Sequence, residues 1–244
     1  MNPFLLVSTR PDEEALDSEY QAYLRATGLD SEQLDLAEFD LIGLPPIDLS
    51  RYRGVFVAGS PYGNATVDGK VSHTQRWVGE ELRVLFQQIL DTDIPCLATG
   101  TAMTILGQTI GATVGEDHAE LASIAEITLT SEGRQDPLLE GMPEDFFAYV
   151  SHTESCEELP EGAHRLAWSL HCPIQMFRHG KYVYATQFNP ELDAEAIQRQ
   201  LEAYADAGDF GIGDADMLVG TGRHTEGNHL AGRILRQFVK YFGS

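Results

Sequence analysis

Two short segments carry the residue types best placed for chemistry. The first, Pro95–Met103, passes from apolar residues through Thr99-Gly100-Thr101 into a sequence typical of a helix. A strand, a tight turn and a helix can lift one side chain to the helix N-terminus, where the helix dipole and free N–H groups stabilise an oxyanion. The second, Tyr182–Glu191, runs from strand-forming residues into a polar turn. Sites in open α/β sheets form at the carboxyl ends of strands, so both segments are candidates.

The elements that must position these segments alternate between strand and helix in the first half of the chain. Apolar runs and helical spacing predict strands at 4–8, 55–58 and 94–99, with helices at 12–28, 73–91 and 101–110. The second half predicts strands at 124–130, 146–151, 165–169, 173–178 and 182–188, and helices at about 193–207 and 228–241. This order predicts an α/β fold, a mostly parallel central sheet flanked by helices. No repeat or linker is evident, so we expect one domain over residues 1–244.

Composition narrows the class of partner. The 244 residues include 38 acidic and 16 basic side chains, a formal net charge of −22. That field repels phosphate backbones and anionic lipids, so we expect no nucleic acid and no membrane as partner. The 43% hydrophobic content indicates a globular chain.

Several features predict a cytoplasmic protein. The N-terminus lacks the basic and apolar regions of a signal peptide, and no apolar run has the roughly 18 residues of a membrane span. The three cysteines, Cys96, Cys156 and Cys172, are odd in number and widely spaced, which suits a reducing compartment. Their spacing is not that of a zinc site, and His224 and His229 are five apart rather than four, so no metal is expected.

At the two candidate segments the chain resembles the class I glutamine amidotransferase family, and most nearly its stand-alone, GMP-synthase-like glutaminase domains. Aligning Pro95 with the proline of the family's elbow places Gly100 at the cysteine position and Gly111 at the closing glycine. The later signature Gln-Phe-His-Pro-Glu is matched by Gln187-Phe188-Asn189-Pro190-Glu191. Further similar segments, in the family's order, are Val57–Pro61, Ser151-His152, Glu158–Gly162 and His171–Arg178. The resemblance spans about residues 4 to 195 and implies a flavodoxin-like three-layer fold.

The resemblance also implies a degenerate catalytic triad. The family's cysteine, histidine and glutamate positions read Gly100, Asn189 and Glu191. Glycine has no nucleophile, and an asparagine amide cannot take up and return a proton near neutral pH. Loss of nucleophile and base as a unit costs on the order of 10⁶ in turnover in a well-studied hydrolytic triad. We therefore expect a pseudo-glutaminase with a binding or regulatory role and no cofactor.

Two other interpretations of the sequence remain open. In one, the chain is an active glutamine amidotransferase or γ-glutamyl hydrolase that uses non-standard residues, with Thr101 or a cysteine as nucleophile. Thr101 also suits a helix N-cap, and the cysteines suit buried structural positions. In the other, the chain has a structural role only, and Met103 or Tyr62 fills the elbow.

The resemblance further assigns ligand-binding positions. Gly59 and the N–H of Thr101 match the family's oxyanion donors, and Ser60 and His152 lie in its motifs; a turn glycine and a structural histidine are the plainer alternatives. The implied ligand is glutamine or a related small molecule. The acidic surface favours a synthase or other protein partner with a basic face, bound less tightly as salt is added.

Overall fold

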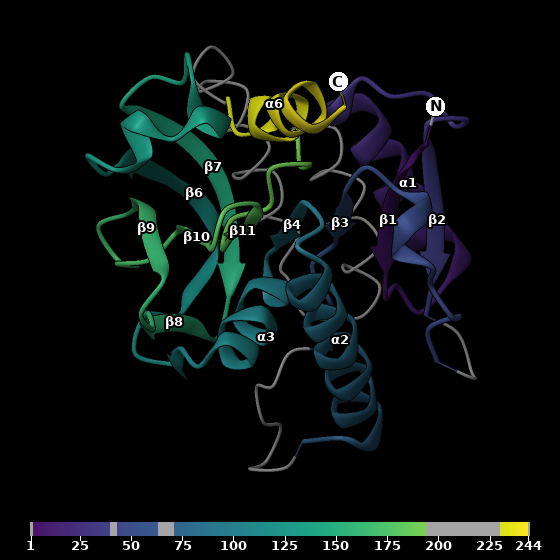
Figure 1. The fold of residues 1–244 in the computed structure, drawn as a ribbon. Coiled ribbons are helices and arrows are strands. Elements are labelled where there is room, and N and C mark those ends of the chain that lie inside the picture. The colour runs from purple at the N-terminus through teal and green to yellow at the C-terminus, as the bar shows by residue number, and fades with distance from the viewer. Residues whose placement is uncertain (1, 40–42, 63–70, 194–229, 244) are drawn as a thin grey trace.

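A nine-stranded sheet forms the middle of the structure, a computed structural model that describes residues 2–39, 43–62, 71–193 and 230–243 (Figure 1). The strand order is β2-β1-β3-β4-β11-β10-β9-β6-β7. These strands are β1 (Phe4–Ser8), β2 (Leu34–Glu38), β3 (Val55–Val57), β4 (Cys96–Thr99), β6 (Glu120–Leu129), β7 (Asp145–His152), β9 (Ala163–Trp168), β10 (Met176–His179) and β11 (Val183–Thr186). A second, two-stranded sheet pairs β5 (Thr113–Gly115) with β8 (Ser155–Glu158).

The large sheet has a parallel half and an antiparallel half. Strands β2, β1, β3, β4 and β11 pair in parallel, in the order of a flavodoxin-like sheet. Strands β10, β9, β6 and β7 continue it antiparallel. The predicted α/β class is confirmed, with the antiparallel extension formed by the strand-rich second half of the sequence.

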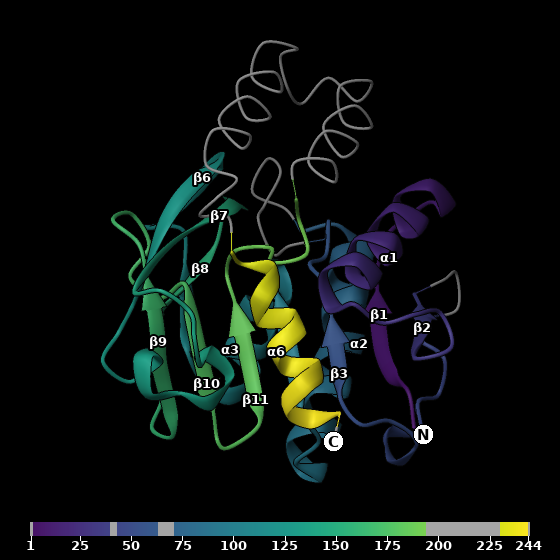
Figure 2. The same cartoon turned by 90° about the horizontal axis from the view of Figure 1, so that it is seen from above.

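Helices cover both faces of the parallel half (Figure 2). Helices α1 (Glu13–Thr27) and α6 (Gly232–Phe242) pack on one face, and α2 (His73–Thr92) and α3 (Thr101–Ile110) on the other. Short 3-10 helices η1 (Leu49–Arg51), η2 (Gly133–Gln135) and η3 (Pro137–Leu139) lie in connections. The helix predicted at 193–207 falls outside the described residues apart from its first residue, as do His224 and His229.

Local sequence signals explain where these helices begin and end. The side chain of Asp12 accepts a hydrogen bond from the Ala15 N–H at the start of α1, and Gly28, at φ 75°, ends that helix. Ser72 and Gln75 form a reciprocal capping box at the start of α2.

The core is divided by the sheet into two apolar clusters. All five residues of β1 are buried, as expected for a strand covered on both faces. Successive side chains alternate, so Phe4 and Leu6 join the α1/α6 cluster while Leu5 and Val7 join the α2/α3 cluster.

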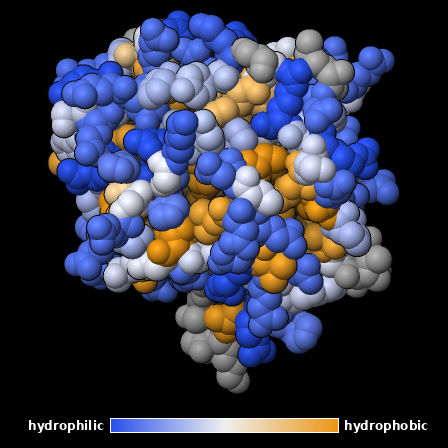
Figure 3. Space-filling model, viewed as in Figure 1, coloured by the Kyte–Doolittle hydropathy of each residue, from blue (hydrophilic) through white to orange (hydrophobic). Residues whose placement is uncertain are grey.

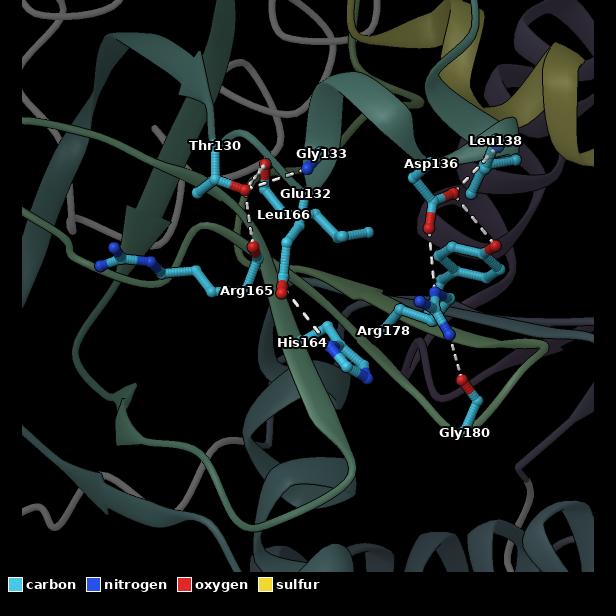
Figure 4. A network of polar contacts seen from close by, with 11 residues as sticks. Thr130, Glu132, Gly133, Asp136, Leu138, His164, Arg165, Leu166, Arg178 and Gly180 are labelled. Carbon is cyan, nitrogen blue, oxygen red and sulfur yellow. Dashed lines mark hydrogen bonds and ion pairs between the residues drawn. The ribbon is translucent and has the colours of Figure 1, made fainter.

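A buried carboxylate ties the two halves of the sheet to the 3-10 helices (Figure 4). Asp136 accepts hydrogen bonds from Arg178 Nε at 2.9 Å on β10, from the Tyr184 hydroxyl at 3.1 Å on β11 and from the Leu138 N–H at 3.0 Å. Arg178 also donates to the carbonyl of Gly180. The charge of Asp136 is thus paired where η3 crosses the sheet beneath α6.

The surface agrees with the acidic composition. On the face shown in Figure 3, hydrophilic residues cover most of the periphery and apolar residues gather near the middle, where α2 and α3 lie. Within the described ranges, no helix combines the length and apolarity needed to cross a bilayer.

The aromatic cluster under α6 should hold that helix on the sheet. Phe238 is fully buried, and its ring centroid lies 5.1 Å from Phe56 and 6.2 Å from Phe4. We predict that Phe238→Ala lowers the free energy of unfolding by about 3–5 kcal/mol, because the packing is lost and a cavity remains. Urea unfolding measures this change. The exposed Arg233→Ala on the same helix should stay within about 0.5 kcal/mol; equal effects of the two changes would contradict the packing role.

Candidate functional site

The predicted elbow forms at the carboxyl end of β4. Gly100 adopts φ 54° and ψ −130°, a conformation that L-residues rarely adopt, and precedes the first residue of α3. Its N–H donates to the Thr186 carbonyl at 2.8 Å, and its carbonyl accepts from the Met103 N–H at 2.9 Å. The first bond joins the elbow to the end of β11. The chain therefore makes the strand–turn–helix arrangement indicated by the sequence.

The side chain of Asn189 lies directly against this elbow. A Cβ atom on residue 100 would lie 2.6 Å from Asn189 Oδ1, closer than real Cβ contacts, and 3.5 Å from the Gly59 Cα. A Cβ on Gly59 would lie 3.1 Å from the same carboxamide oxygen. The structure thus brings Gly59, Gly100 and Asn189 together. The carboxamide takes the space in which a side chain at position 100 would begin.

The turn after β11 positions Asn189. Its N–H donates to the Tyr149 carbonyl on β7 at 3.2 Å, and its carbonyl accepts from the Leu192 N–H at 3.2 Å. Upstream, the Thr186 hydroxyl donates to the Phe188 carbonyl at 2.9 Å. Backbone bonds on both sides therefore fix the residue whose side chain meets the elbow.

Glu191 is buried two residues further on. It is 4% exposed, and its Oε2 has no hydrogen-bond partner among the described residues. Burial raises the pKa of Glu191 from 4.5 to about 8, against the opposing effect of its own backbone N–H; nearby Glu19 raises the pKa further and Arg10 lowers it. At neutral pH the carboxyl group is therefore mainly protonated.

A second buried glutamate lies beside β1 and was not indicated by the sequence motifs. Glu19 on α1 accepts a hydrogen bond from Ser8 Oγ at 2.5 Å and from Arg10 Nε at 2.7 Å. The Arg10 Nη2 atom lies 2.7 Å from the same carboxylate. A signal existed, since Glu19 falls on the buried face of α1 between Leu16 and Tyr23. The network positions polar groups at the end of β1, next to the elbow strand's neighbour β3.

Hydroxyl groups line the ends of the parallel strands. Thr9 donates to Ser60 Oγ at 2.9 Å, and the Tyr62 N–H donates to that oxygen at 3.0 Å. The hydroxyls of Tyr23 and Thr99 share a hydrogen bond of 2.9 Å. Ser60, a predicted ligand-binding residue, is therefore held within this edge and is 6% exposed.

Thr101 and His152 occupy different surroundings. Thr101 is the first residue of α3, half-buried, and its carbonyl accepts from the Thr104 hydroxyl at 2.9 Å. His152 ends β7, and its Nε2 lies 3.0 Å from the His118 carbonyl oxygen and 3.5 Å from Glu120 Oε2. Burial lowers the pKa of His152 to about 4, so its ring is neutral at pH 7. Thr101 stands at the elbow, whereas the contacts of His152 are with the antiparallel half; its ligand-binding role stays a prediction.

All three thiols are buried. Desolvation raises the pKa of Cys96, which lies in the core strand β4. It also raises the pKa of Cys156 to about 12 and that of Cys172 to about 11. These side chains are therefore protonated and poorly nucleophilic near neutral pH.

The fold and motif order are shared with known proteins. The chain is 27% identical over 190 residues to the glutamine-hydrolysing subunit of the GMP synthase of Natronomonas pharaonis, covering 76% of this chain and 89% of that protein. It is 29% identical over 103 residues to the corresponding GMP synthase subunit of Archaeoglobus fulgidus, covering 42% of this chain and 55% of that protein.

Solved structures agree on the fold. A glutamine amidotransferase from Thermotoga maritima superposes with a TM-score of 0.77 at 20% identity, covering 99% of this chain and 98% of the other. One from Methylobacillus flagellatus gives 0.74 at 13% identity, covering 99% and 96%. At these identities the likeness speaks for the fold alone. The family model for class I glutamine amidotransferases matches residues 20–202. With the elbow and its following turn in the expected places, this chain belongs to the class I glutamine amidotransferase family.

Proposed function

We propose that this chain is a pseudo-glutaminase: it keeps the amidotransferase fold, does not hydrolyse glutamine, and acts by binding a small molecule and a protein partner. The observation that carries the proposal is the contact at the elbow. Asn189 Oδ1 would lie 2.6 Å from a Cβ on residue 100, so the residue at the base position takes the space of the nucleophile. The two replacements fit each other as a pair.

The state of Glu191 supports the proposal. In a nucleophile–base–acid triad, a carboxylate orients the base and stabilises the imidazolium that forms during the reaction. Here Asn189 forms no cation, and burial keeps Glu191 mainly neutral at pH 7 with a pKa of about 8. A carboxyl group in that state is suited to packing or to donating a hydrogen bond.

The active alternative finds little support among the described residues. Nucleophilic catalysis by cysteine needs a thiolate, and burial raises the pKa of every cysteine of this chain. The hydroxyl of Thr101 requires an adjacent base, and the residue at the family's base position is Asn189. A role for Met103 or Tyr62 in filling the elbow is also unnecessary, since Asn189 lies there.

The ligand and partner follow from chemistry and from the relatives. The N-terminus of α3 presents N–H groups beside Gly59, an arrangement that favours a carbonyl or carboxylate oxygen such as those of glutamine. The relatives named as GMP synthase subunits suggest a synthase as the protein partner. The net charge of −22 favours a basic face on that partner. We also propose that residues 1–244 form one domain and that the protein is cytoplasmic, with no membrane or nucleic acid as partner.

Ammonia release from glutamine tests the lack of catalysis. We predict no release above buffer by the wild-type chain, and detectable release or a thioester after the double change Gly100→Cys with Asn189→His, because this restores nucleophile and base on the same scaffold. Either change alone should give no turnover. Wild-type turnover that disappears in Glu191→Ala would contradict the proposal, as would a correctly folded double variant that never reacts with a glutamine analogue.

The fit between residues 100 and 189 can be measured by stability. Gly100→Ala should cost about 1–3 kcal/mol of unfolding free energy beyond its backbone strain, because the new Cβ collides with the carboxamide. Gly111→Ala is the matched control: φ is 95° and no atom lies within 4 Å of its Cβ position, so only the strain of about 1–2 kcal/mol applies. Combining Gly100→Ala with Asn189→Ala should remove the excess cost. Additive effects in this double-mutant cycle would show that the two residues do not contact.

The buried Glu191 predicts a pH dependence of stability. Its pKa is 4.5 when exposed and about 8 in the fold, so between these values the folded chain keeps a proton that the unfolded chain has lost. Folding therefore becomes less favourable as pH rises through this window, by up to roughly 1.4 kcal/mol per pH unit.

Glu191→Gln removes this titration. We predict that the variant gains stability relative to wild type as pH rises from about 5 to 8, measured by urea unfolding at each pH. Glu161→Gln, at an exposed glutamate, should follow wild type across the range. A difference between Glu191→Gln and wild type that does not change with pH would contradict the raised pKa.

A further inference from the structure

A cluster of three chemically different side chains lies away from the elbow, in the antiparallel half of the structure. Within the part of the chain that the structure describes, Glu120, His152 and Cys172 form the one group of this kind, with ligand-type atoms all within 4.8 Å of one another. They come from the start of β6, the end of β7 and the loop between β9 and β10. Glu120 and His152 are cross-strand partners, so the sheet register sets their proximity.

The cluster is closed off from solvent. The side chains of His152 and Glu120 are 3% and 6% exposed, and Cys172 is fully buried. A carboxylate is rarely buried to this extent unless it is paired or bound to a metal. Mere solvation of surface charges therefore does not account for the group.

The histidine ring is left with an unused nitrogen. Its Nε2 lies 3.0 Å from the His118 carbonyl, to which it donates, so the neutral ring carries its free lone pair on Nδ1. That Nδ1 atom is buried and has no hydrogen-bond partner among the described residues. Buried polar atoms are nearly always partnered, and a lone pair in this state calls for a bound donor or cation.

Neighbouring groups orient the cluster as outer-shell residues do around metals. Gln175 Nε2 donates to Glu120 Oε2 at 2.7 Å and to Ser169 Oγ at 3.0 Å. Ser169 also accepts from the Cys172 N–H at 3.1 Å, which holds the cysteine loop in place. The remaining carboxamide oxygen of Gln175 is buried without a partner among the described residues, so it is available as a fourth oxygen ligand.

We propose that Glu120, His152 and Cys172 form a binding site for a single zinc ion. Sulfur, imidazole nitrogen and carboxylate oxygen are the ligands that zinc takes, at about 2.0–2.3 Å, which places ligand atoms of a tetrahedron roughly 3.3–3.8 Å apart. The 3.5 Å between His152 Nε2 and Glu120 Oε2 is already in this range, and the 4.8 Å limit on the group requires only a small contraction. Binding releases the thiol proton of Cys172 to solvent. Sequence spacing does not reveal the site because its ligands meet only through strand pairing.

Metal titration of the full chain tests the site. After removal of metals by a chelator, the wild-type protein should bind one Zn²⁺ per chain, measured by competition with a chromophoric chelator, and its melting temperature should rise with added Zn²⁺. Co²⁺ in place of Zn²⁺ should give a near-ultraviolet charge-transfer band from the thiolate ligand. No stoichiometric Zn²⁺ binding, or a Co²⁺ spectrum without this band, would overturn the proposal.

Matched cysteine variants assign the ligand. Cys172→Ser should lose the Co²⁺ band and the Zn²⁺-induced rise in melting temperature, whereas Cys96→Ser, at a buried thiol in β4, should keep both. If Cys172→Ser does not fold, Glu120→Gln serves instead and should weaken Zn²⁺ binding by at least about 10-fold. Equal Zn²⁺ affinity in wild type and in the folded ligand variant would refute the assignment. Neither outcome depends on glutamine chemistry.

Discussion

The hydrogen bond between the Gly100 N–H and the Thr186 carbonyl fixes the relation on which the site depends. It holds the turn after β4 beside the turn after β11, so residues 100 and 189 are neighbours whatever side chains they carry. In a catalytic relative this constraint would bring nucleophile and base together. In this chain it places a carboxamide oxygen against a glycine, in a space that a Cβ could share only if Asn189 moved. The parallel sheet thus preserves the geometry of a triad while the side chains have changed to fit one another.

The electrostatics at the strand ends follow the same logic. Arg10 pairs with Glu19, and that ion pair lies beside the buried Glu191. Taking a carboxylate out of water is costly unless a cation or several donors replace the solvent, so the group responds by holding its proton. A histidine at position 189 would supply such a cation; Asn189 does not. The raised pKa of Glu191 is therefore the electrostatic counterpart of the missing base.

Much of the fold could be predicted from sequence because local signals were strong. Gly28, Gly100 and Gly111 marked turns that the structure confirms at positive φ, and the continuous apolar run Phe4–Ser8 marked a strand buried on both faces. The edge strand β2 was missed, since its sequence Leu34–Glu38 contains two acidic residues that are poor strand formers. Contacts across the sheet could not be read from spacing. Glu19 reaches the strand ends from α1, and the Glu120 group forms only when β6 pairs with β7.

The central claim is that no residue at or near the elbow can act as a nucleophile toward glutamine. Exposing the purified wild-type chain to an electrophilic glutamine analogue and weighing the intact protein by mass spectrometry tests this most directly. We expect an unchanged mass, with the Gly100→Cys and Asn189→His double variant gaining one adduct as the positive control. A stoichiometric adduct on the wild-type protein, mapped by peptide analysis to Thr101 or to a cysteine, would contradict the claim.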